Sequence, residues 1–305
     1  MKPIRQDAVT VPKQLRNSVE SIQQSQKELP AIVSISDIHA YHERAQSALL
    51  ALQDHPGYDP VVIKDDAGQL RWAENNYVLI FNGDLVDRGN KNEAVLRMVS
   101  RLAAQAPPGR VRVTLGNHEA IALSADYFWF ESWYAGSVGE QDRRALLNAI
   151  QDGLVVAAYR GYNFTYAHAG ADDSYDVGAV NQQLLTAAEE LHNALETDSD
   201  VTTQETIIQK YARVLGTGDG MNPKGKGAGL VWLDLQHLSP TAPAQVVGHT
   251  KFQTPKKKNN IVCQNVITVN EKKGSPGGET VFVETPSELV AITRMSDGGT
   301  TERQY

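Results

Sequence analysis

The most informative stretch of the chain is the apolar segment Tyr77-Val-Leu-Ile-Phe81 with the polar segment that follows it, Asn82-Gly83-Asp84-Leu85-Val86-Asp87-Arg88-Gly89. Hydrophobicity this continuous is typical of a strand covered on both faces, so we predict a central position in a sheet. The apolar run ends where the polar segment begins. The sequence therefore places two carboxylates and a guanidinium at the carboxyl end of a buried strand.

Four other predicted strands also lead directly into a polar motif. They are residues 31–36 before Asp37-Ile38-His39-Ala40, residues 110–115 before Gly116-Asn117-His118-Glu119, residues 162–167 before His168-Ala169-Gly170, and residues 244–247 before Gly248-His249-Thr250. Helical patterns over 43–52 and 92–104 alternate with the first strands. This alternation predicts an α/β fold with parallel pairing, in which functional loops gather at the carboxyl ends of the strands.

The side chains at these strand ends share a chemistry suited to metal ions. They are Asp37, His39, Asp84, Asp87, Arg88, Asn117, His118, His168 and His249. A single histidine or aspartate at a strand end is usually structural, but five such loops are not independent. Carboxylate, imidazole and amide donors together suit Mn²⁺, Fe²⁺ and Zn²⁺, and a carboxylate can bridge two ions. The pattern predicts a centre with two divalent metals.

These motifs resemble the signature blocks of the phosphoprotein phosphatase family of calcineurin-like metallophosphoesterases, and they stand in the family order. The most specific are Gly-Asp-x-x-Asp-Arg-Gly at residues 83–89 and Gly-Asn-His-Glu at residues 116–119. A predicted hairpin over 61–72 and the segment Gly229-Leu-Val-Trp232 look most like the bacterial-type, Shewanella-like branch. The resemblance implies the calcineurin-like fold, a central β-sandwich flanked by helices with the metal site at the strand carboxyl ends.

The resemblance also implies roles for the motif residues. Asp37, His39 and Asp84 would hold one metal, while Asp84, Asn117, His168 and His249 would hold the other, with Asp84 as the bridge. A hydroxide bridging the metals would attack phosphorus directly, and Mn²⁺ is the favoured ion over Fe or Zn²⁺. His118 would protonate the leaving oxygen, Asp87 would orient the His118 ring, and Arg88 would bind two phosphoryl oxygens, with Asn117 also facing the substrate.

The chain departs from the family pattern in two places. Ala40 stands where glycine is usual, so its loop must either adopt an ordinary backbone conformation or accept a small side chain close to the metals. The family's second phosphate-binding arginine is also missing. We expect Lys224 or Lys226, in the glycine-rich segment 216–229, to replace it by closing over the phosphate. The alternatives are that both lysines are solvated and that Arg44, Arg213 or a backbone amide makes the contact.

The division of the chain follows from its pattern. Residues 1–30 are a polar extension, either a disordered leader or a short docking helix, since Leu15, Val19 and Ile22 share one helical face. Residues 31–305 form the metallophosphoesterase domain, with a helical cap insertion at about 171–229. The aromatic stretch over 127–134 is expected in the core or in a wall rather than as a base-stacking platform.

Composition limits the partners of the protein. The chain has 305 residues, 41% of them hydrophobic and 21% charged, which is typical of a globular protein. Its net charge of −7 argues against nucleic-acid binding, and it contains neither a membrane-spanning run nor the apolar core of a signal peptide, so we expect a cytoplasmic protein without membrane partners. The single cysteine excludes an intramolecular disulfide framework.

These observations lead to one functional hypothesis. The chain is expected to be a phosphomonoester hydrolase, most plausibly a protein phosphatase acting on phosphorylated proteins or peptides. The alternative of the same fold is a phosphodiesterase or dinucleoside polyphosphate hydrolase. A binding scaffold without activity would lack metal ligands, and none is missing. Nothing in the sequence indicates the oligomeric state.

Overall fold

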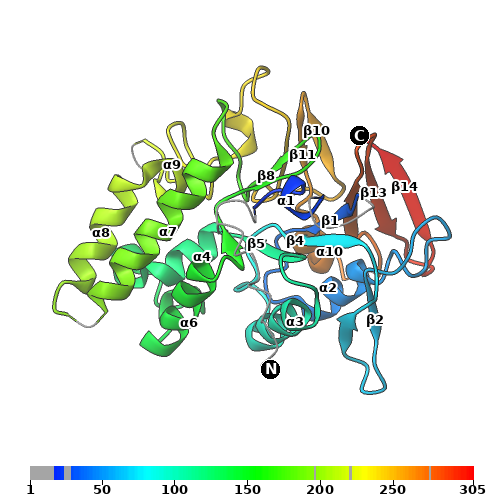
Figure 1. Cartoon of the computed structure of the whole chain (residues 1–305), viewed down its shortest axis with the longest axis horizontal. Helices are drawn as coiled ribbons and strands as arrows, with labels where there is room; N and C mark the ends of the chain where they lie inside the picture. Colours follow the sequence, from blue (N-terminus) through cyan, green and yellow to red (C-terminus); the bar gives the residue numbers. More distant parts are fainter. Residues whose placement is uncertain (1–16, 24–28, 196, 220–221, 275) are drawn as a thin grey trace, which may run out of the picture.

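The computed structural model describes residues 17–23, 29–195, 197–219, 222–274 and 276–305. Two β-sheets pack together in the molecule, and most of the helices lie to the left of them and below them in Figure 1. This arrangement confirms the predicted α/β fold with a central sandwich.

The larger sheet has seven strands of mixed direction. Its central strands β1, β4, β5 and β6 run parallel, and β12, β13 and β14 extend it in antiparallel fashion beyond β1. In spatial order the strands are β14 (Thr300–Gln304), β13 (Leu289–Arg294), β12 (Thr280–Glu284), β1 (Ala31–Ile35), β4 (Tyr77–Phe81), β5 (Val111–Thr114) and β6 (Val155–Val156). All five residues of β4 are buried, as the unbroken apolar run predicts.

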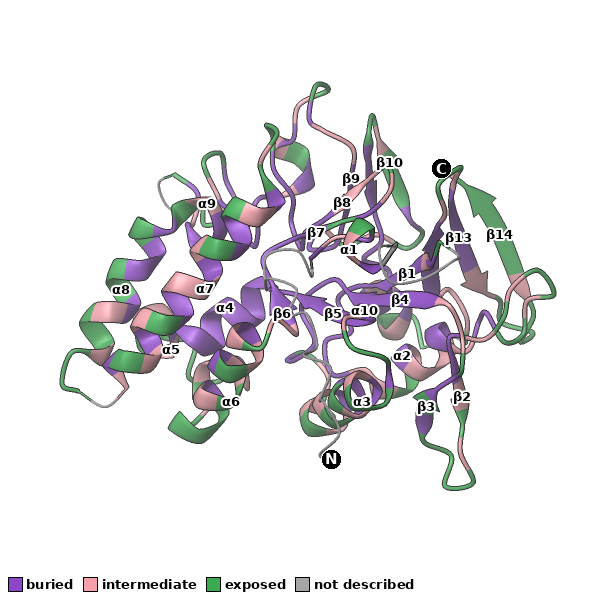
Figure 2. Cartoon of the chain, viewed as in Figure 1, coloured by how far each residue is buried: buried purple, intermediate pink, exposed green. Residues whose placement is uncertain are grey.

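The second sheet packs against the first through a shared apolar core. Ile32, Ile80 and Phe282 of the large sheet lie in one cluster with Tyr166 and Val262 of the smaller sheet. The smaller sheet has five strands, in spatial order β10 (Lys256–Lys258), β11 (Ile261–Cys263), β9 (Gln245–Val247), β8 (Thr165–Tyr166) and β7 (Tyr159–Arg160). Figure 2 shows that the central strands β4 and β5 are buried, whereas the edge strand β14 is exposed.

Helices cover the other face of the large sheet. Val33 and Leu79 alternate with the sandwich-facing residues of β1 and β4 and pack in one cluster with Leu49 and Leu102 of two helices. The helices are α1 (Glu20–Gln23), α2 (His42–Leu49), α3 (Asn92–Gln105), α4 (Asn117–Leu123), α5 (Ala125–Phe128), α6 (Glu140–Gln151), α7 (Val177–Ala194), α8 (Asp200–Lys210), α9 (Ala212–Leu215) and α10 (Ile267–Lys272), with 3₁₀ turns η2 (Ala135–Ser137) and η3 (Leu235–His237). The predicted hairpin is β2 (Val62–Lys64) with β3 (Leu70–Trp72).

The predicted cap region contains α7, α8 and α9, which gather at one end of the molecule beside α6 (Figure 1). Among the described residues, no helix combines the length and the apolarity needed to cross a bilayer.

The described N-terminal residues 17–23 contribute to the core. Val19 and Ile22 are buried in the cluster between the two sheets, and the Val19 amide donates to the carbonyl of Arg160. Ile22 lies in the four-residue helix α1 and Val19 directly before it, whereas Leu15 lies outside the described residues.

The chain crosses from the large sheet to the smaller one within residues 154–159. The segment 154–159 is not a single strand, because it leaves the large sheet after β6 and enters the smaller sheet at β7. The Asn181 side chain accepts hydrogen bonds from the amides of Ala157 and Ala158 and donates one to the Ala158 carbonyl. A side chain of α7 thus supplies the partners that a neighbouring strand would otherwise provide.

Candidate active site

The carboxyl ends of the strands from both sheets meet at one place. Asp37 follows β1, Asp84 follows β4 and Asn117 begins α4 after β5, while His168 and His249 follow β8 and β9 of the smaller sheet. All five side chains are buried. The two layers of the sandwich therefore deliver the predicted metal ligands to a common centre.

Asp84 lies between two groups of ligand atoms. Its Oδ2 is 3.5 Å from His39 Nε2 and 3.3 Å from His168 Nε2. One group with metal-ligand geometry contains His39, Asp84 and His118, and the other contains Asp84, His168 and His249. Because Asp84 belongs to both groups, it is the side chain placed to bridge two ions.

The second group includes the amide of Asn117. Its Oδ1 is 2.9 Å from His249 Nδ1 and 3.2 Å from His168 Nε2. Those two imidazole nitrogens are only 3.1 Å apart. These three atoms can each donate a lone pair, and their close approach in a buried site suits the binding of one cation.

The first group differs from the predicted ligand set, because it contains His118 where the prediction has Asp37. The carboxylate of Asp37 is 3.8 Å from His39 Nε2, but it also accepts hydrogen bonds from the His249 amide, at 3.1 Å, and from Asn265 Nδ2, at 2.6 Å. Sequence reasoning missed Asn265 because it lies 228 positions from Asp37 and belongs to no motif.

Hydrogen bonds from the second ring nitrogen orient two of the three proposed ligand histidines, His39 and His168. The Nδ1–H of His39 donates to the carbonyl of Val86, and the Nδ1–H of His168 donates to the carbonyl of Asn82, each at 3.0 Å. These bonds leave Nε2 of both rings facing Asp84. Metal-binding histidines are commonly fixed in this way.

The electrostatics of the cluster favour a bound cation. Burial lowers the pKa of His39 to about 3, which leaves this ring neutral and able to donate a lone pair. Burial also lowers the pKa of His168, but Asp84 and Asp37 outweigh it and raise that pKa to about 9. In addition, His249 Nε2 is buried without a hydrogen-bond partner among the described residues. The donor set therefore fits the two divalent metals.

His118 and Asp87 form a pair beside this cluster. The Nδ1–H of His118 donates to Asp87 Oδ2 at 2.5 Å, and the His118 Nε2 atom faces the cluster, 3.9 Å from Asp84 Oδ2. The ring of Trp133 stacks on that of His118 with centroids 4.9 Å apart, and the Ala135 amide donates to Asp87 Oδ1. The pair is thus held from two sides by the loop over 133–135.

Arg88 is exposed at the mouth of the cluster. Its Nε donates to His39 Nε2 at 3.2 Å, its Nη2 lies 3.4 Å from His118 Nε2, and no carboxylate of the described residues pairs with it. The fork of the guanidinium is therefore available for phosphoryl oxygens between the cluster and His118.

The comparisons with known proteins agree with this geometry. The family model described as calcineurin-like phosphoesterase matches residues 30–250, a segment that includes every predicted metal ligand. The chain belongs to the calcineurin-like phosphoesterase family. This confirms the predicted family and the predicted class of enzyme, a phosphoester hydrolase.

The individual relatives have low sequence identity to this phosphoesterase. Serine/threonine-protein phosphatase 2 of Salmonella typhimurium is 32% identical over 124 residues, covering 36% of this chain and 53% of the relative, so the chain spans about half the length of that curated protein. The cold-active protein-tyrosine phosphatase of a psychrophilic Shewanella species covers 90% of this chain and 80% of its own, with a TM-score of 0.55 and 19% identity. A 1.1 Å structure of a cold-active protein tyrosine phosphatase has a TM-score of 0.57 and 18% identity over 90% of this chain and 78% of its own. These structures show the fold.

Backbone strain is concentrated in this site. Nine non-glycine residues of the described chain have a positive φ, and seven of them belong to the site motifs: Asp37, His39, Ala40, Asp84, Asp87, Arg88 and His249. Ala40 has a φ of 59°, so it keeps the left-handed conformation that suits the family's glycine. The neighbouring Gly89 must stay small, because a Cβ there would lie 2.8 Å from the Ala40 carbonyl. Strain of this kind persists where the surroundings hold the functional side chains in place.

Glu119 stabilises the loop that follows β4 in this phosphoesterase. Its carboxylate accepts hydrogen bonds from the amides of Asp84, Leu85 and Gly116 at 2.8–3.0 Å. The sequence motif contains Glu119, but its role becomes visible only when β4 and β5 lie side by side. It fixes the backbone that carries the shared ligand Asp84.

The glycine-rich segment brings one of its two lysines to the site. Burial lowers the pKa of Lys224, and the nearby carboxylate of Asp84 partly offsets this effect. Lys226 is exposed, and its charge acts on Asp172 instead. Arg44 is paired with Glu271 and Glu279, and Arg213 is paired with Asp173, so neither guanidinium is free to reach a phosphate. Among these side chains, Lys224 is the one whose charge interacts with Asp84, and its role in phosphate binding stays a prediction.

The glycines of this segment serve close packing of the backbone. A Cβ on Gly229 would lie 2.5 Å from the Ala212 carbonyl oxygen, and one on Gly218 would lie 2.6 Å from the Gly225 nitrogen. The amide of Gly229 donates to the carbonyl of Gly216, which closes the base of the loop. These contacts hold Lys224 beside the site, and closure over the phosphate stays a prediction.

The aromatic stretch over 127–134 is divided between two environments. Trp133 forms part of the site wall, as expected, and stacks with both His118 and Phe130. Trp129 is 78% exposed and belongs to neither core nor wall.

Proposed function

We propose that this chain is a phosphomonoester hydrolase with two divalent metals, acting on phosphorylated proteins. The observation that carries the proposal is the position of Arg88 and the His118–Asp87 pair directly beside the shared ligand Asp84. The proposed ligands are Asp37, His39 and Asp84 for one ion and Asp84, Asn117, His168 and His249 for the other. When bound, two such ions activate a water molecule and neutralise phosphoryl charge.

The residues of the chain would share the remaining work. Arg88 binds and orients the phosphoryl oxygens through its fork, and Lys224 adds a second positive charge. His118 holds a proton on Nε2 for the leaving oxygen, while Asp87 keeps the ring oriented through Nδ1. Asn117 lies where it can contact both a metal and the substrate.

The number of cations favours a monoester over a diester. A phosphate monoester carries up to two charges and three terminal oxygens, which match the metals, Arg88 and Lys224 together. A diester has one charge and two free oxygens, so it would leave one of these cations unmatched. Mn²⁺ is the ion we propose first; the imidazole, carboxylate and amide donors suit Fe²⁺ and Zn²⁺ as well.

A comparison of substrates tests this proposal. We expect the protein with Mn²⁺ to hydrolyse an aryl phosphate and phosphopeptides much faster than an aryl diester or a dinucleoside tetraphosphate. Exhaustive chelation, verified by elemental analysis, should abolish the activity, and added Mn²⁺ should restore it. Faster turnover of the tetraphosphate than of every monoester would replace the proposal with the polyphosphate alternative.

Lys224 offers a sharper test of phosphate binding. Lys224→Ala is expected to lower kcat/KM by about 10-fold, because it removes a charge beside Asp84 without touching a proposed metal ligand. Lys226→Ala is the matched control and should change kcat/KM by less than about 2-fold, since its side chain faces solvent. Steady-state kinetics and metal content of both variants would be measured. Equal effects of the two substitutions would remove Lys224 from phosphate binding.

A further inference from the structure

A cleft of about 550 Å³ opens beside the proposed site for the phosphoryl group. It begins at Arg88 and His118 and extends away from the metal ligands. Its other lining residues are Tyr41, Asp87, Gly89, Asn92, Ser132, Trp133, Tyr134 and Lys272. The cleft is larger than a phosphate group, so it has room for a part of the substrate beyond the scissile bond.

The charges that line this cleft are unbalanced. Arg88 and Lys272 are positive, and the sole carboxylate of the lining, Asp87, already accepts from His118 and from the Ala135 amide. Within the described part of the chain, no carboxylate pairs with the ammonium of Lys272. The adjacent Glu271 is occupied by Arg44.

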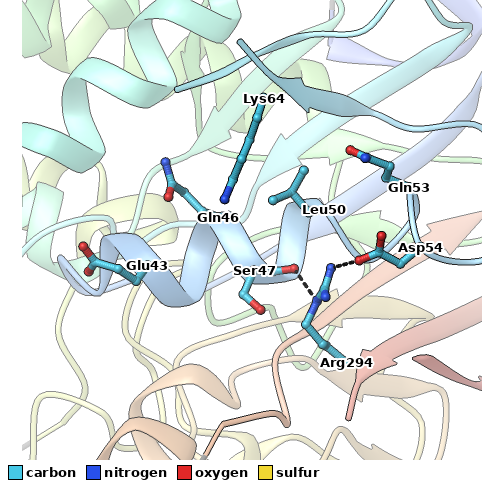
Figure 3. A pocket seen from close by; sticks show the side chains of 8 residues that line it. All are labelled: Glu43, Gln46, Ser47, Leu50, Gln53, Asp54, Lys64 and Arg294. Atoms are coloured by element: carbon cyan, nitrogen blue, oxygen red, sulfur yellow. Dashed lines mark hydrogen bonds and ion pairs between the residues drawn. The ribbon is translucent and has the colours of Figure 1, made fainter. Parts of the chain in front are cut away.

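In another surface pocket, the positively charged side chain already has a counterion from the chain itself. This pocket lies along α2, and Figure 3 shows Arg294 pointing to Asp54 and to the backbone of Ser47. Arg294 pairs with Asp54 and donates to the Ser47 carbonyl. Its guanidinium ties β13 to α2 and has no need of a ligand, whereas Lys272 has no such partner.

The walls of the cleft indicate the kind of anion. Trp133 already stacks with His118 at an interplanar angle of 7° and with Phe130 at 12°, so the faces of its ring are used. A nucleobase would therefore find no free face of Trp133. Asn92, Ser132 and the rims of the tyrosines instead offer hydrogen bonds and short apolar surfaces, which suit an extended peptide.

We infer that the cleft binds an acidic side chain next to the phosphorylated residue of a protein substrate, with Lys272 as its counterion. The inference rests on the proposed function, since it assumes a phosphopeptide. It names the substrate class as phosphoproteins in which aspartate or glutamate flanks the phosphorylated residue. A lysine suits this task because its charge is mobile and needs no fixed geometry.

The test compares two phosphopeptides of the same length and with the same phosphorylated residue. One carries Asp or Glu at the positions on both sides, and the other carries Lys or Arg. We expect the wild-type enzyme to prefer the acidic peptide by about 10-fold in kcat/KM at low salt, and added salt should reduce the preference. Lys272→Glu should abolish or reverse this ratio. The ratio is the readout because a general loss of activity affects both peptides equally.

Lys273→Glu is the matched control, since Lys273 is the exposed neighbour of Lys272 and does not line the cleft. It should leave the ratio unchanged. Equal turnover of the two peptides by the wild-type enzyme would overturn the inference while the proposed function stands. Hydrolysis of an aryl phosphate without hydrolysis of either peptide would overturn both. If Lys272→Glu instead reduced turnover of a nucleoside polyphosphate selectively, the cleft would bind a second phosphoryl group and the inference would be wrong.

Discussion

Asp84→Asn is expected to lose bound metal and, with it, nearly all activity. Asp84 is the one carboxylate that belongs to both ligand groups, with Oδ2 within 3.5 Å of His39 and His168. An amide has the same shape but no charge, so two cations would share one ligand fewer and lose a negative charge between them. We expect metal affinity to fall by at least about 100-fold, because even residues that only orient a ligand change affinity by 10–100-fold.

Two measurements check this result without relying on turnover. Elemental analysis after dialysis should find metal in the wild-type protein and little in the variant. Addition of Mn²⁺ should raise the melting temperature of the wild-type protein by mass action but not that of the variant. The fold should survive, since the amide oxygen of the substituted side chain could still accept the hydrogen bond that the His118 amide donates to Asp84. Asp66→Asn, at an exposed turn position, is the control. Full metal content in Asp84→Asn would contradict the bridging role.

The positions of the proposed ligands were predictable because each depends on short-range sequence. An apolar run that ends in Asp84, or one that ends in Asp37, fixes both the strand and the residue at its carboxyl end. Parallel pairing then brings those ends to one edge of the sheet. The prediction needed no knowledge of distances, and the structure supplies them.

The supports of the site were not predictable in the same way. Trp133 reaches His118 only because α4, α5 and η2 turn the chain back over the site, and the local pattern assigned it no more than a general wall position. Asn265 contacts Asp37 from a distant part of the chain. Such contacts arise from tertiary packing, which leaves no periodic signal in the sequence.

Glycine content also does not show how the loop over 216–229 packs, because glycines are compatible both with mobility and with close backbone contacts. In the structure, Gly218 and Gly229 allow backbone segments to approach more closely than any side chain would permit. Similarly, Asn181 redirects the chain between the two sheets, an effect that strand propensity alone cannot show.

His118→Asn is expected to retain both metals and lower kcat by about 10²- to 10⁴-fold, the range typical of a lost general acid. The size of the defect should depend on the leaving group. Nitrophenolate departs with little need for a proton, whereas an alkoxide must be protonated. The defect should therefore be small with a nitrophenyl phosphate and large with an alkyl phosphate. The geometry supports this role because Nδ1 is engaged by Asp87 and Nε2 faces the cluster.

Asp87→Asn is the companion variant, because it would disturb His118 without removing it. We expect a smaller defect with the same dependence on the leaving group, and a double variant no worse than His118→Asn alone, since the two residues act as a unit. Metal content should match that of the wild-type protein in all three variants. If His118→Asn slowed the nitrophenyl and alkyl esters equally, His118 would have to act by binding or by supporting the metals, and Asp87 would then be its structural anchor rather than a partner in proton transfer.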